Sequence, residues 1–526
     1  MCSSAVEKLS LDSGAKGGVP RRSFSREFIL VAFLIGLGLR LVGLTLPPFD
    51  NHATRQTQTL STIQAFYVDG IDLLRPRVNY AGYPGLLVLE LPVFQGFVAL
   101  LFRAFGPHLE IIRILNLLMG AATILLLYRI TVRLLDAPTA IVAALIYWLA
   151  PLNISYQRSM LIDPTAVCAA MLSFYSLLLF LPRAGDGGGT GNGWLWLSVF
   201  AAATWLTVMM KALYLWPVVL LFGYLVFLRR WRLDKKSAAV VITFIICGAS
   251  FLAWNVYATR INNTSPMTTG LKPTSLLGFS ALMEPQFYFN MIVRRPKLWL
   301  GILGALAYPI GLWAAWRGRH EKRWFPVLCL CILIPPSYLL LFANINRPHD
   351  YYQLIITPFL SIVSAHGLLW IASRFVRSFS RTEWENGSVA ATSILLAITG
   401  AFFYLSWLHA PHVDQRIVNF QELCSGKFES QAPGMVFIGA DKNLLPRPGS
   451  IPEYIYAAGL WGYGRIVEKS SDARSLFLEA MPGFERVDYL VFYGTDKPDW
   501  ASQSGFRPVL VDDVSQMYAF KHVNSP

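Results

Sequence analysis

The sequence predicts an all-α polytopic membrane domain followed by a small C-terminal α/β domain. The 526 residues are 54% hydrophobic and only 14% charged, whereas about a quarter of a soluble protein is charged. Apolar segments of about 20 residues, the length that crosses a bilayer, recur along the chain. After Leu408 the composition changes to charged turns and short apolar runs. These three observations exclude an ordinary soluble protein.

The positive charge of the chain has a topological explanation. A formal net charge of +14 would suit nucleic-acid binding in a soluble protein. Here the basic residues cluster between apolar segments, as in the cytoplasmic loops of membrane proteins. We therefore expect no nucleic-acid partner. The clusters that we place in the cytoplasm are Arg21/Arg22/Arg26, Arg129/Arg133, Arg183, 229–236, 317–323 and Arg374/Arg377/Arg381.

The apolar segments predict about 11 transmembrane helices with a cytoplasmic N-terminus and an outer C-terminus. They cover residues 28–46, 111–131, 139–151, 164–182, 194–212, 214–228, 237–257, 297–316, 324–343, 353–373 and 388–408. Residues 84–105 are apolar but interrupted by Glu90 and Pro92. A crossing there would place Arg129 and Arg133 outside, so we expect a juxtamembrane helix on the outer surface instead. The basic run 294–297 is the exception that this topology leaves outside.

Three domains follow from this pattern. Residues 1–26 are predicted to be a disordered cytoplasmic tail, 27–408 the membrane domain, and 409–526 an extracytoplasmic α/β domain. In the last region, apolar runs at 435–439, 454–457, 487–493 and 509–512 accompany a helical pattern at 471–481. Strand-like runs that alternate with a helix are typical of a small α/β domain.

The predicted topology gathers polar side chains from four separate segments at one outer level of the membrane. Ionisable groups at this depth are costly and usually face a cavity, so their convergence predicts a functional site. The candidates are Asp50, His52, Arg55, Gln56, Tyr83 and Glu90 in the first loop, Asp163 in a later loop, Lys211 at a helix end, and Arg347, His349 and Tyr351 in a short turn.

Several of these residues also have structural interpretations. Asp50 could cap the helix that begins near Ala53, because Asp is a favoured N-cap. Lys211 could extend toward the headgroups, and Tyr351 could be an interfacial anchor. Glu90 could pair on the surface helix, and Asp163 precedes a proline, which suits the start of a helix.

The set also fits a reaction. An enzyme outside the cytoplasm has no nucleotide sugar or ATP, so its activated donor would be a lipid-linked phosphate. Transfer needs a carboxylate that takes a proton from the acceptor and cations that stabilise the departing phosphate. We expect Asp50 to be the general base. Lys211, Arg347 and His349 would stabilise the phosphate, with help from Arg55. Asp163 would orient the acceptor or the base.

The order of the short motifs resembles the GT-C glycosyltransferases that use polyprenyl-phosphate sugars, including protein O-mannosyltransferases and the lipid A aminoarabinose transferase. The matching stretches are Asp50-Asn51-His52 with Arg55-Gln56, Tyr83-Pro84 with Glu90-Leu91-Pro92, 151–156 with Asp163-Pro164, Lys211, and His349-Asp350-Tyr351-Tyr352. The resemblance implies an acidic base in the first outer loop, which maps to Asp50. It also implies juxtamembrane helices, inversion at the anomeric carbon, and a lipid, glycan or protein acceptor.

This chain departs from its relatives at two places. Many have Asp-Glu where Asp50-Asn51 stands here, which leaves a divalent metal ion a possibility and no cofactor certain. Some have Lys-Pro-Pro where this chain has Gly82-Tyr83-Pro84-Gly85, so phosphate binding would fall to Lys211.

The alternative function is a transporter or flippase for a lipid-linked or anionic solute. It would require acids deep within the spans and an internal repeat, and neither is evident.

Overall fold

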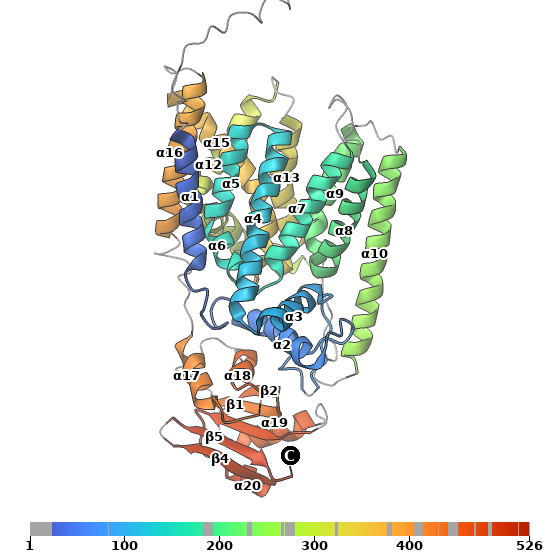
Figure 1. Ribbon diagram of the computed structural model, residues 1–526, viewed down its shortest axis with the longest axis vertical. Helices are drawn as coiled ribbons and strands as arrows, with labels where there is room; N and C mark the ends of the chain where they lie inside the picture. Colours follow the sequence, from blue (N-terminus) through green and yellow to red (C-terminus); the bar gives the residue numbers. More distant parts are fainter. Residues whose placement is uncertain are drawn as a thin grey trace, which may run out of the picture.

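The computed structural model describes residues 24–524 except 83, 182–192, 229–233, 265–267, 269–278, 321–324, 376–380, 404–413, 430, 440–450, 468–469, 482–485 and 514. Figure 1 shows a bundle of long helices, two shorter helices lying across one end of it, and a sheet domain beyond them. The bundle contains α1 (Phe24–Leu41), α4 (Leu109–Leu134), α5 (Ala137–Leu149), α6 (Pro151–Gln157), α7 (Asp163–Phe180), α8 (Gly193–Lys211), η1 (Ala212–Leu215), α9 (Trp216–Leu228), α10 (Lys235–Asn262), α12 (Pro296–Arg317), α13 (Phe325–Leu341), α15 (Thr357–Phe375) and α16 (Arg381–Phe403).

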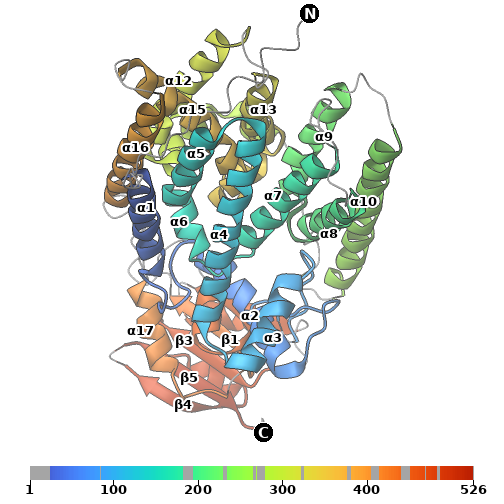
Figure 2. The ribbon, with the colours of Figure 1, turned by 45° about the horizontal axis from the view of Figure 1, so that its top comes forward.

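The protein is a multi-pass membrane protein by the length and composition of its helices. Six described helical segments are long and apolar enough to cross a bilayer, or seven if α5 and α6 count as one span bent by 62°. Pro151 explains the bend, because it has no N–H to continue the helix. The expected count of about 11 is not confirmed by this criterion. In Figures 1 and 2, α1 and α16 flank one side of the bundle and α10 the other.

The predicted surface helix exists but is shorter than expected. Helix α3 begins at Val93, directly after Pro92, and ends at Phe105. Residues before it form an irregular segment, so the expected helix over 84–92 is wrong and Glu90 lies on a loop. Helix α3 lies crosswise beside α2 (Ala53–Asp69) at the end of the bundle (Figure 1).

Several helix ends meet the first loop and define one end of the bundle. The start of α4 reaches it through Arg113, whose guanidinium donates to Gly43 O at 2.8 Å. The last turns of α10 reach it through Trp254 and Asn262, which bond Leu89 and Val88. The basic residues at the other ends of these helices therefore lie away from the first loop. This relative arrangement agrees with the charge pattern, while the side of the membrane remains a prediction.

Short helices and turns connect the bundle at the end nearest the first loop. They are η2 (Ser280–Met283), α11 (Pro285–Phe289), η3 (Asn290–Arg294), α14 (Ala343–Asn346) and η4 (Asp350–Ile356). The last of these leads directly into α15 and carries the turn predicted to contribute to the site. Its residues Tyr351 and 353–356 are buried.

The C-terminal part is a mixed α/β domain. Its sheet has the strand order β2-β1-β3-β5-β4, with β1 parallel to β2 and β3 and the remaining pairs antiparallel. The elements are α17 (Gln415–Cys424), β1 (Pro433–Gly439), α18 (Ile451–Ala457), β2 (Trp461–Val467), α19 (Ser470–Ala480), β3 (Tyr489–Tyr493), α20 (Asp499–Gln503), β4 (Phe506–Asp512) and β5 (Met517–His522). The apolar run at 454–457 is a helix, not a strand.

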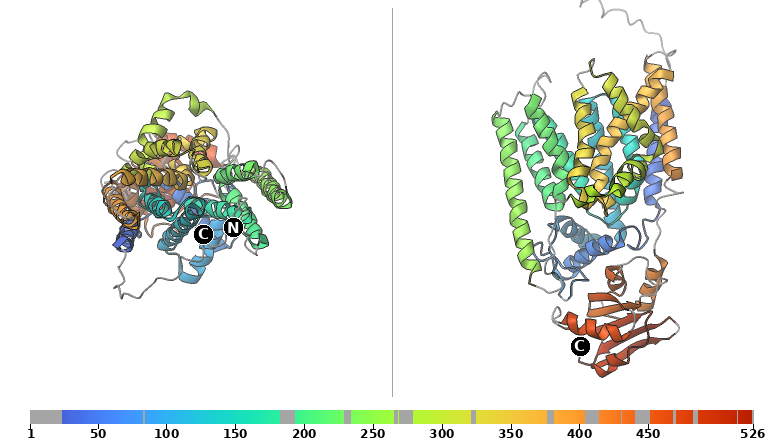
Figure 3. Two further views of the ribbon diagram at one scale, coloured as in Figure 1. Left: turned by 90° about the horizontal axis from the view of Figure 1, so that it is seen from above. Right: turned by 180° about the vertical axis from the view of Figure 1, so that it is seen from behind.

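The C-terminal domain rests on helix α2. Thr54 donates a hydrogen bond to the Glu453 carboxylate of α18, and Gln64 donates to the Tyr456 hydroxyl at 3.2 Å. Phe49, just before α2, packs into the core of the domain. Figure 3 shows from behind that α2 and α3 lie between the helix bundle and the sheet. The first loop is therefore enclosed from both sides.

Candidate active site

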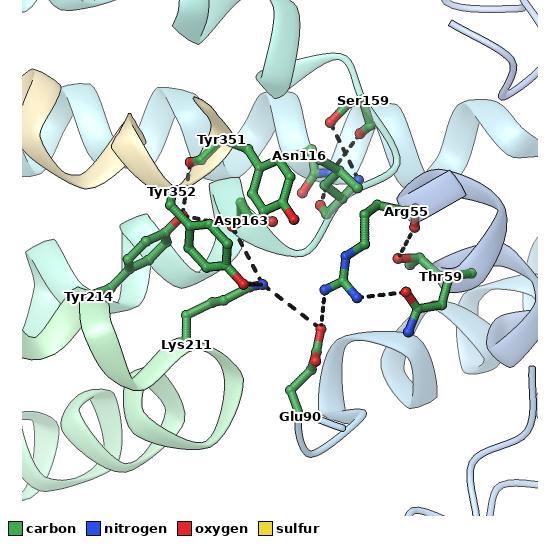
Figure 4. A network of polar contacts seen from close by, with 12 residues as sticks. Arg55, Thr59, Glu90, Asn116, Ser159, Asp163, Lys211, Tyr214, Tyr351 and Tyr352 are labelled. Atoms are coloured by element: carbon green, nitrogen blue, oxygen red, sulfur yellow. Dashed lines mark hydrogen bonds and ion pairs between the residues drawn. The ribbon is translucent and has the colours of Figure 1, made fainter. Parts of the chain in front are cut away.

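Charged side chains converge where α2, the loop before α3, and the ends of α7 and α8 meet (Figure 4). Four of them form what we call the shared-charge cluster: Arg55, Glu90, Asp163 and Lys211. One Arg55 nitrogen lies 2.8 Å from Glu90 Oε1, and Lys211 Nζ lies 4.0 Å from the same oxygen. Lys211 Nζ also lies 3.9 Å from Asp163 Oδ1. Two cations and two acids from four elements therefore share one space.

Aromatic side chains surround Lys211 in this cluster. Its ammonium lies 4.6 Å from the ring centre of Tyr352 and 3.4 Å from the Tyr352 hydroxyl. Tyr214 donates to Asp163 at 2.7 Å and to the Tyr351 carbonyl at 3.0 Å. The Lys211 side chain is only 4% exposed, which argues against the alternative in which it extends toward the headgroups.

Glu90 is ionised in this environment. Burial by itself would raise the pKa of Glu90, but the positive charges of Arg55 and Lys211 outweigh burial, and the pKa lies below its usual value. Arg55 is fixed further by a 2.6 Å hydrogen bond to Gln58. The pair joins α2 to the loop before α3.

A second group, which we call the Asp350 cluster, contains His52, Tyr156, Arg295 and Asp350. His52 Nε2 lies 2.8 Å from Asp350 Oδ1, Arg295 lies 3.2 Å from Oδ2, and the Tyr156 hydroxyl donates to the same carboxylate. His52 has a φ of 55°, in the left-handed region that is costly for a residue with a Cβ. Such conformations cluster at functional sites. The Asp350 contact holds His52 in place.

Asp50 pairs with residues that belong to neither cluster. Its Oδ2 lies 2.9 Å from Arg158, and its Oδ1 accepts from the Gln56 side-chain amide. The side chains of Asp50 and Arg158 are only 5% and 3% exposed. The N-cap of α2 is His52, with no side-chain hydrogen bond, so Asp50 is not the side-chain cap that the sequence suggested.

Arg347 and His349 do not match the predicted role of cations at the phosphate. Arg347 pairs with Glu284 at 2.8 Å, and its side chain is 54% exposed. Burial, followed by the nearby His52 and the positive charges of Arg55 and Lys211, lowers the pKa of His349 to about 4. His349 is therefore neutral near pH 7, although its ring lies 5.2 Å from that of Tyr351 at the rim of the site.

The remaining candidates from the sequence are Tyr351, Gln56, Tyr83 and Asp163. Tyr351 is buried, and its ring packs 5.0 Å from His52; it belongs to the site rather than to a membrane anchor. Gln56 Oε1 accepts from the Met160 N–H at 3.1 Å, so it links α2 to the segment before α7. Tyr83 lies outside the described residues. Helix α7 begins at Asp163, as predicted.

A metal site receives no support from the described residues, among which no three His, Cys, Asp or Glu side chains form a group suited to an ion. His52 and His349 lie near each other, with ring centres 6.2 Å apart. His52 already uses one nitrogen for Asp350. The possible divalent cofactor thus has no defined ligand set here.

Sequence reasoning omitted some residues of the site. Asp350, Tyr352 and Tyr156 stand within the matching stretches, and Arg158 follows one of them, but as neighbours of the chosen candidates. Arg295 stands out in the sequence because the basic run 294–297 breaks the charge bias, which suggested a role in attracting an anionic headgroup. The structure pairs it with Asp350.

Known proteins of one kind are similar in sequence to part of this chain. The family model for dolichyl-phosphate-mannose-protein mannosyltransferase matches residues 90–254. An undecaprenyl phosphate-alpha-4-amino-4-deoxy-L-arabinose arabinosyl transferase of Pseudomonas aeruginosa is 28% identical over 356 residues. That match covers 66% of this chain and 60% of the relative. The corresponding protein of Pseudomonas paraeruginosa is also 28% identical, over 371 residues.

Solved structures extend the likeness to nearly the whole fold. ArnT from Cupriavidus metallidurans bound to undecaprenyl phosphate has a TM-score of 0.62, with 14% identity and coverage of 95% of this chain and 98% of ArnT. An oligosaccharyltransferase of Archaeoglobus fulgidus has a TM-score of 0.58, with 11% identity and coverage of 90% and 70%. The chain is therefore a polytopic membrane protein with the GT-C glycosyltransferase fold. Within that class it is related to the aminoarabinose transferases and the O-mannosyltransferases, as the motif order predicted.

Proposed function

We propose that this protein is a membrane glycosyltransferase that moves a sugar from a polyprenyl-phosphate-linked donor to an extracytoplasmic acceptor, which is a lipid, a glycan or a protein. The supporting observation is the meeting of Arg55 and Lys211 around a single carboxylate oxygen. Two cations from separate elements are suited to a phosphate, whose negative charge grows as the sugar leaves.

A small cavity beside Lys211 suits the junction between the phosphate and the lipid of such a donor. It is lined by the polar groups Glu90, Lys211 and Tyr352 and by apolar side chains of α8, η1 and α10, including Val208, Met209, Leu213, Phe251 and Trp254. A phosphate that carries an apolar chain needs cations for the phosphate and apolar side chains for the start of the chain. The relatives named above use undecaprenyl phosphate sugars, and one ArnT structure contains undecaprenyl phosphate.

The proposed reaction is a direct displacement. Asp50 takes the proton of the acceptor hydroxyl or amine, the acceptor atom forms a bond to the sugar C1, and the bond from C1 to the phosphate oxygen breaks. The electron pair goes to the phosphate, which Arg55 and Lys211 stabilise, and the configuration at C1 inverts. Each oxygen of a carboxylate has two lone pairs, so the bonds from Gln56 and Arg158 leave Asp50 able to accept a proton.

Asp163 takes a positioning role in this proposal. Its carboxylate accepts from Tyr214 and lies 3.9 Å from Lys211, so it orients the cation rather than the acceptor.

The orientation of the protein in the membrane follows the charge bias, with the N-terminus in the cytoplasm and the site and C-terminal domain outside. The transporter alternative is disfavoured because these clusters lie at one end of the bundle and not along a path through it.

The direct test is binding of undecaprenyl phosphate to the full chain purified in detergent. We expect Lys211→Met and Arg55→Gln to weaken binding strongly, while Arg347→Gln, at the exposed pair, leaves it unchanged. Cells that lack the protein should accumulate one lipid-linked sugar, which would identify the donor. A wild-type protein that binds no polyprenyl phosphate would refute the proposal. Wild-type affinity in both Lys211→Met and Arg55→Gln would also refute it.

A further inference from the structure

Glu90 occupies the space that the proposed function assigns to the donor phosphate. Its Oε1 lies 2.8 Å from Arg55 and 4.0 Å from Lys211, the two cations that would hold the phosphate. A phosphate oxygen bound to both cations would need the same position. We propose that the Glu90 carboxylate is a placeholder for this phosphate, present when the lipid is absent and displaced when the lipid binds. This inference rests on the proposed function.

The charges of the cluster support an exchange. Arg55 and Lys211 balance Glu90 and Asp163, so the four side chains together are neutral. A phosphodiester adds one negative charge, and a phosphomonoester adds between one and two near neutral pH. An added anion therefore leaves the buried cluster with excess negative charge, which is costly in a poorly solvated space. One acid must move away from the cations when phosphate arrives.

Glu90 is the acid that can move. Asp163 lies at the start of α7, its side chain is 2% exposed, and Tyr214 donates to it. Glu90 lies on a loop, its side chain is 17% exposed, and one hydrogen bond from Arg55 holds its carboxylate in the described structure. Its separation from Lys211 Nζ is 4.0 Å, too long for a hydrogen bond. Release of Glu90 therefore breaks fewer contacts than release of Asp163.

The loop itself is anchored, so a side-chain rotation is enough for the exchange. The Leu91 N–H donates to the Met209 carbonyl at 3.1 Å. The Asn262 side chain bonds both the N–H and the carbonyl of Val88 at 2.8 Å. These bonds lie on either side of Glu90 and tie the loop to α8 and α10. The backbone stays while the carboxylate turns.

A second cavity offers a place for the displaced carboxylate. Glu90 lines both the cavity beside Lys211 and another between α2 and the loop before α3. The second cavity is lined by polar side chains, among them Gln58, Thr59 and Gln95. Amide and hydroxyl groups can donate hydrogen bonds to a carboxylate. Glu90 therefore lies between two small cavities, both of which it lines.

The placeholder has a consequence for turnover. The donor is a phosphodiester with one negative charge, whereas the released polyprenyl phosphate is a monoester with up to two. The product would therefore bind the two cations more tightly than the donor does. A carboxylate that competes for the same cations opposes this product retention. Glu90 thus speeds release of the product at the cost of donor affinity.

The test compares Glu90→Gln and Glu90→Met with wild type in the detergent-purified full chain. Both variants remove the competing charge at similar side-chain length, so we expect about tenfold tighter binding of undecaprenyl phosphate, about 1.4 kcal/mol. Its dissociation should slow correspondingly. Glu90→Asp keeps the charge and should stay near wild type. Glu284→Gln, which removes a carboxylate from the exposed Arg347 pair, is the matched control and should change nothing.

The outcomes separate the two proposals. Equal or weaker binding by both uncharged variants, with wild type binding normally, would refute the placeholder and leave the glycosyltransferase proposal standing. It would assign Glu90 to holding Arg55 and Lys211 in position. Failure of wild type and all variants to bind the lipid would refute both. Thermal unfolding of each variant identifies any loss of binding that comes from misfolding, and inorganic phosphate as a competitor tests whether the phosphate alone drives the exchange.

Discussion

The Asp50–Arg158 pair and the shared-charge cluster show two ways of burying charge in one site. Asp50 and Arg158 form a close pair at 2.9 Å, and both side chains are nearly inaccessible. In the shared-charge cluster, Lys211 lies 3.9–4.0 Å from two acids at once and borders a cavity. A close pair satisfies both charges and resists change, whereas a loosely shared cation can accept a new anion. We therefore assign ligand exchange to the shared-charge cluster.

Asp50→Asn is the substitution with the largest expected effect. Loss of the proposed base should lower the transfer rate by about 10²–10⁴-fold, as measured with the lipid-linked sugar identified from cells that lack the protein. The change also removes the charge that balances buried Arg158, so the free energy of unfolding should fall by up to about 3 kcal/mol. Binding of undecaprenyl phosphate should persist and serves as the folding control. Transfer at the wild-type rate would show that Asp50 belongs to the structure alone.

Lys211→Met tests the contribution of charge in the shared-charge cluster. The methionine keeps most of the side-chain length but removes the charge, so transfer should fall by about 10²–10³-fold through loss of phosphate stabilisation. Lys211→Arg keeps a charge and should retain part of the activity. Similar losses in both variants would mean that the shape of the site, rather than its charge, is what Lys211 supplies.

Asp350→Asn tests whether the Asp350 cluster positions the first loop. The neutral side chain would loosen His52 and Arg295, so we expect transfer to fall about tenfold through misplacement of the loop. The binding of undecaprenyl phosphate should change less than the rate, because Arg55 and Lys211 keep their contacts. A larger loss of binding than of rate would instead place Asp350 at the phosphate site.

His349 predicts a pH dependence of stability. Its folded-state pKa of about 4 lies below the usual value near 6.5, so the unfolded chain binds a proton more readily. The stability contribution is present above about pH 6.5 and is lost as the pH falls toward 4, by up to about 3 kcal/mol. Unfolding in detergent at pH 7.5 and pH 5 measures this loss. His349→Gln should reduce it, and an unchanged pH profile in that variant would assign the loss to other groups.

Arg347→Gln should have the smallest effect. The Arg347–Glu284 pair is exposed, and such pairs contribute about 0–1 kcal/mol. We expect transfer within about threefold of wild type and an unfolding free energy reduced by less than about 1 kcal/mol. Salt should weaken the difference further. A loss comparable to that in Lys211→Met would restore Arg347 to the phosphate site predicted from sequence.

Local patterns in the sequence marked some helix starts but missed or mistook several short elements. The proline at 92 marks the start of α3, and the Asp163-Pro164 pair marks the start of α7, because proline suits the first turn of a helix. Strands β2 and β5 were missed, since β2 contains two glycines and reads as a turn. The run at 454–457 was read as a strand because short apolar runs fit either element.

Hydropathy and charge spacing by themselves determined that this chain is a membrane protein with polar residues gathered at one level, because the bilayer imposes a length on each apolar segment and a bias on each loop. The tertiary structure decided which charge meets which. Nothing in the sequence indicates that Asp50 binds Arg158, that Arg347 turns outward, or that Glu90 lies between Arg55 and Lys211. Those pairings depend on how helices far apart in the chain pack, and a change of a few ångströms in that packing alters each partner.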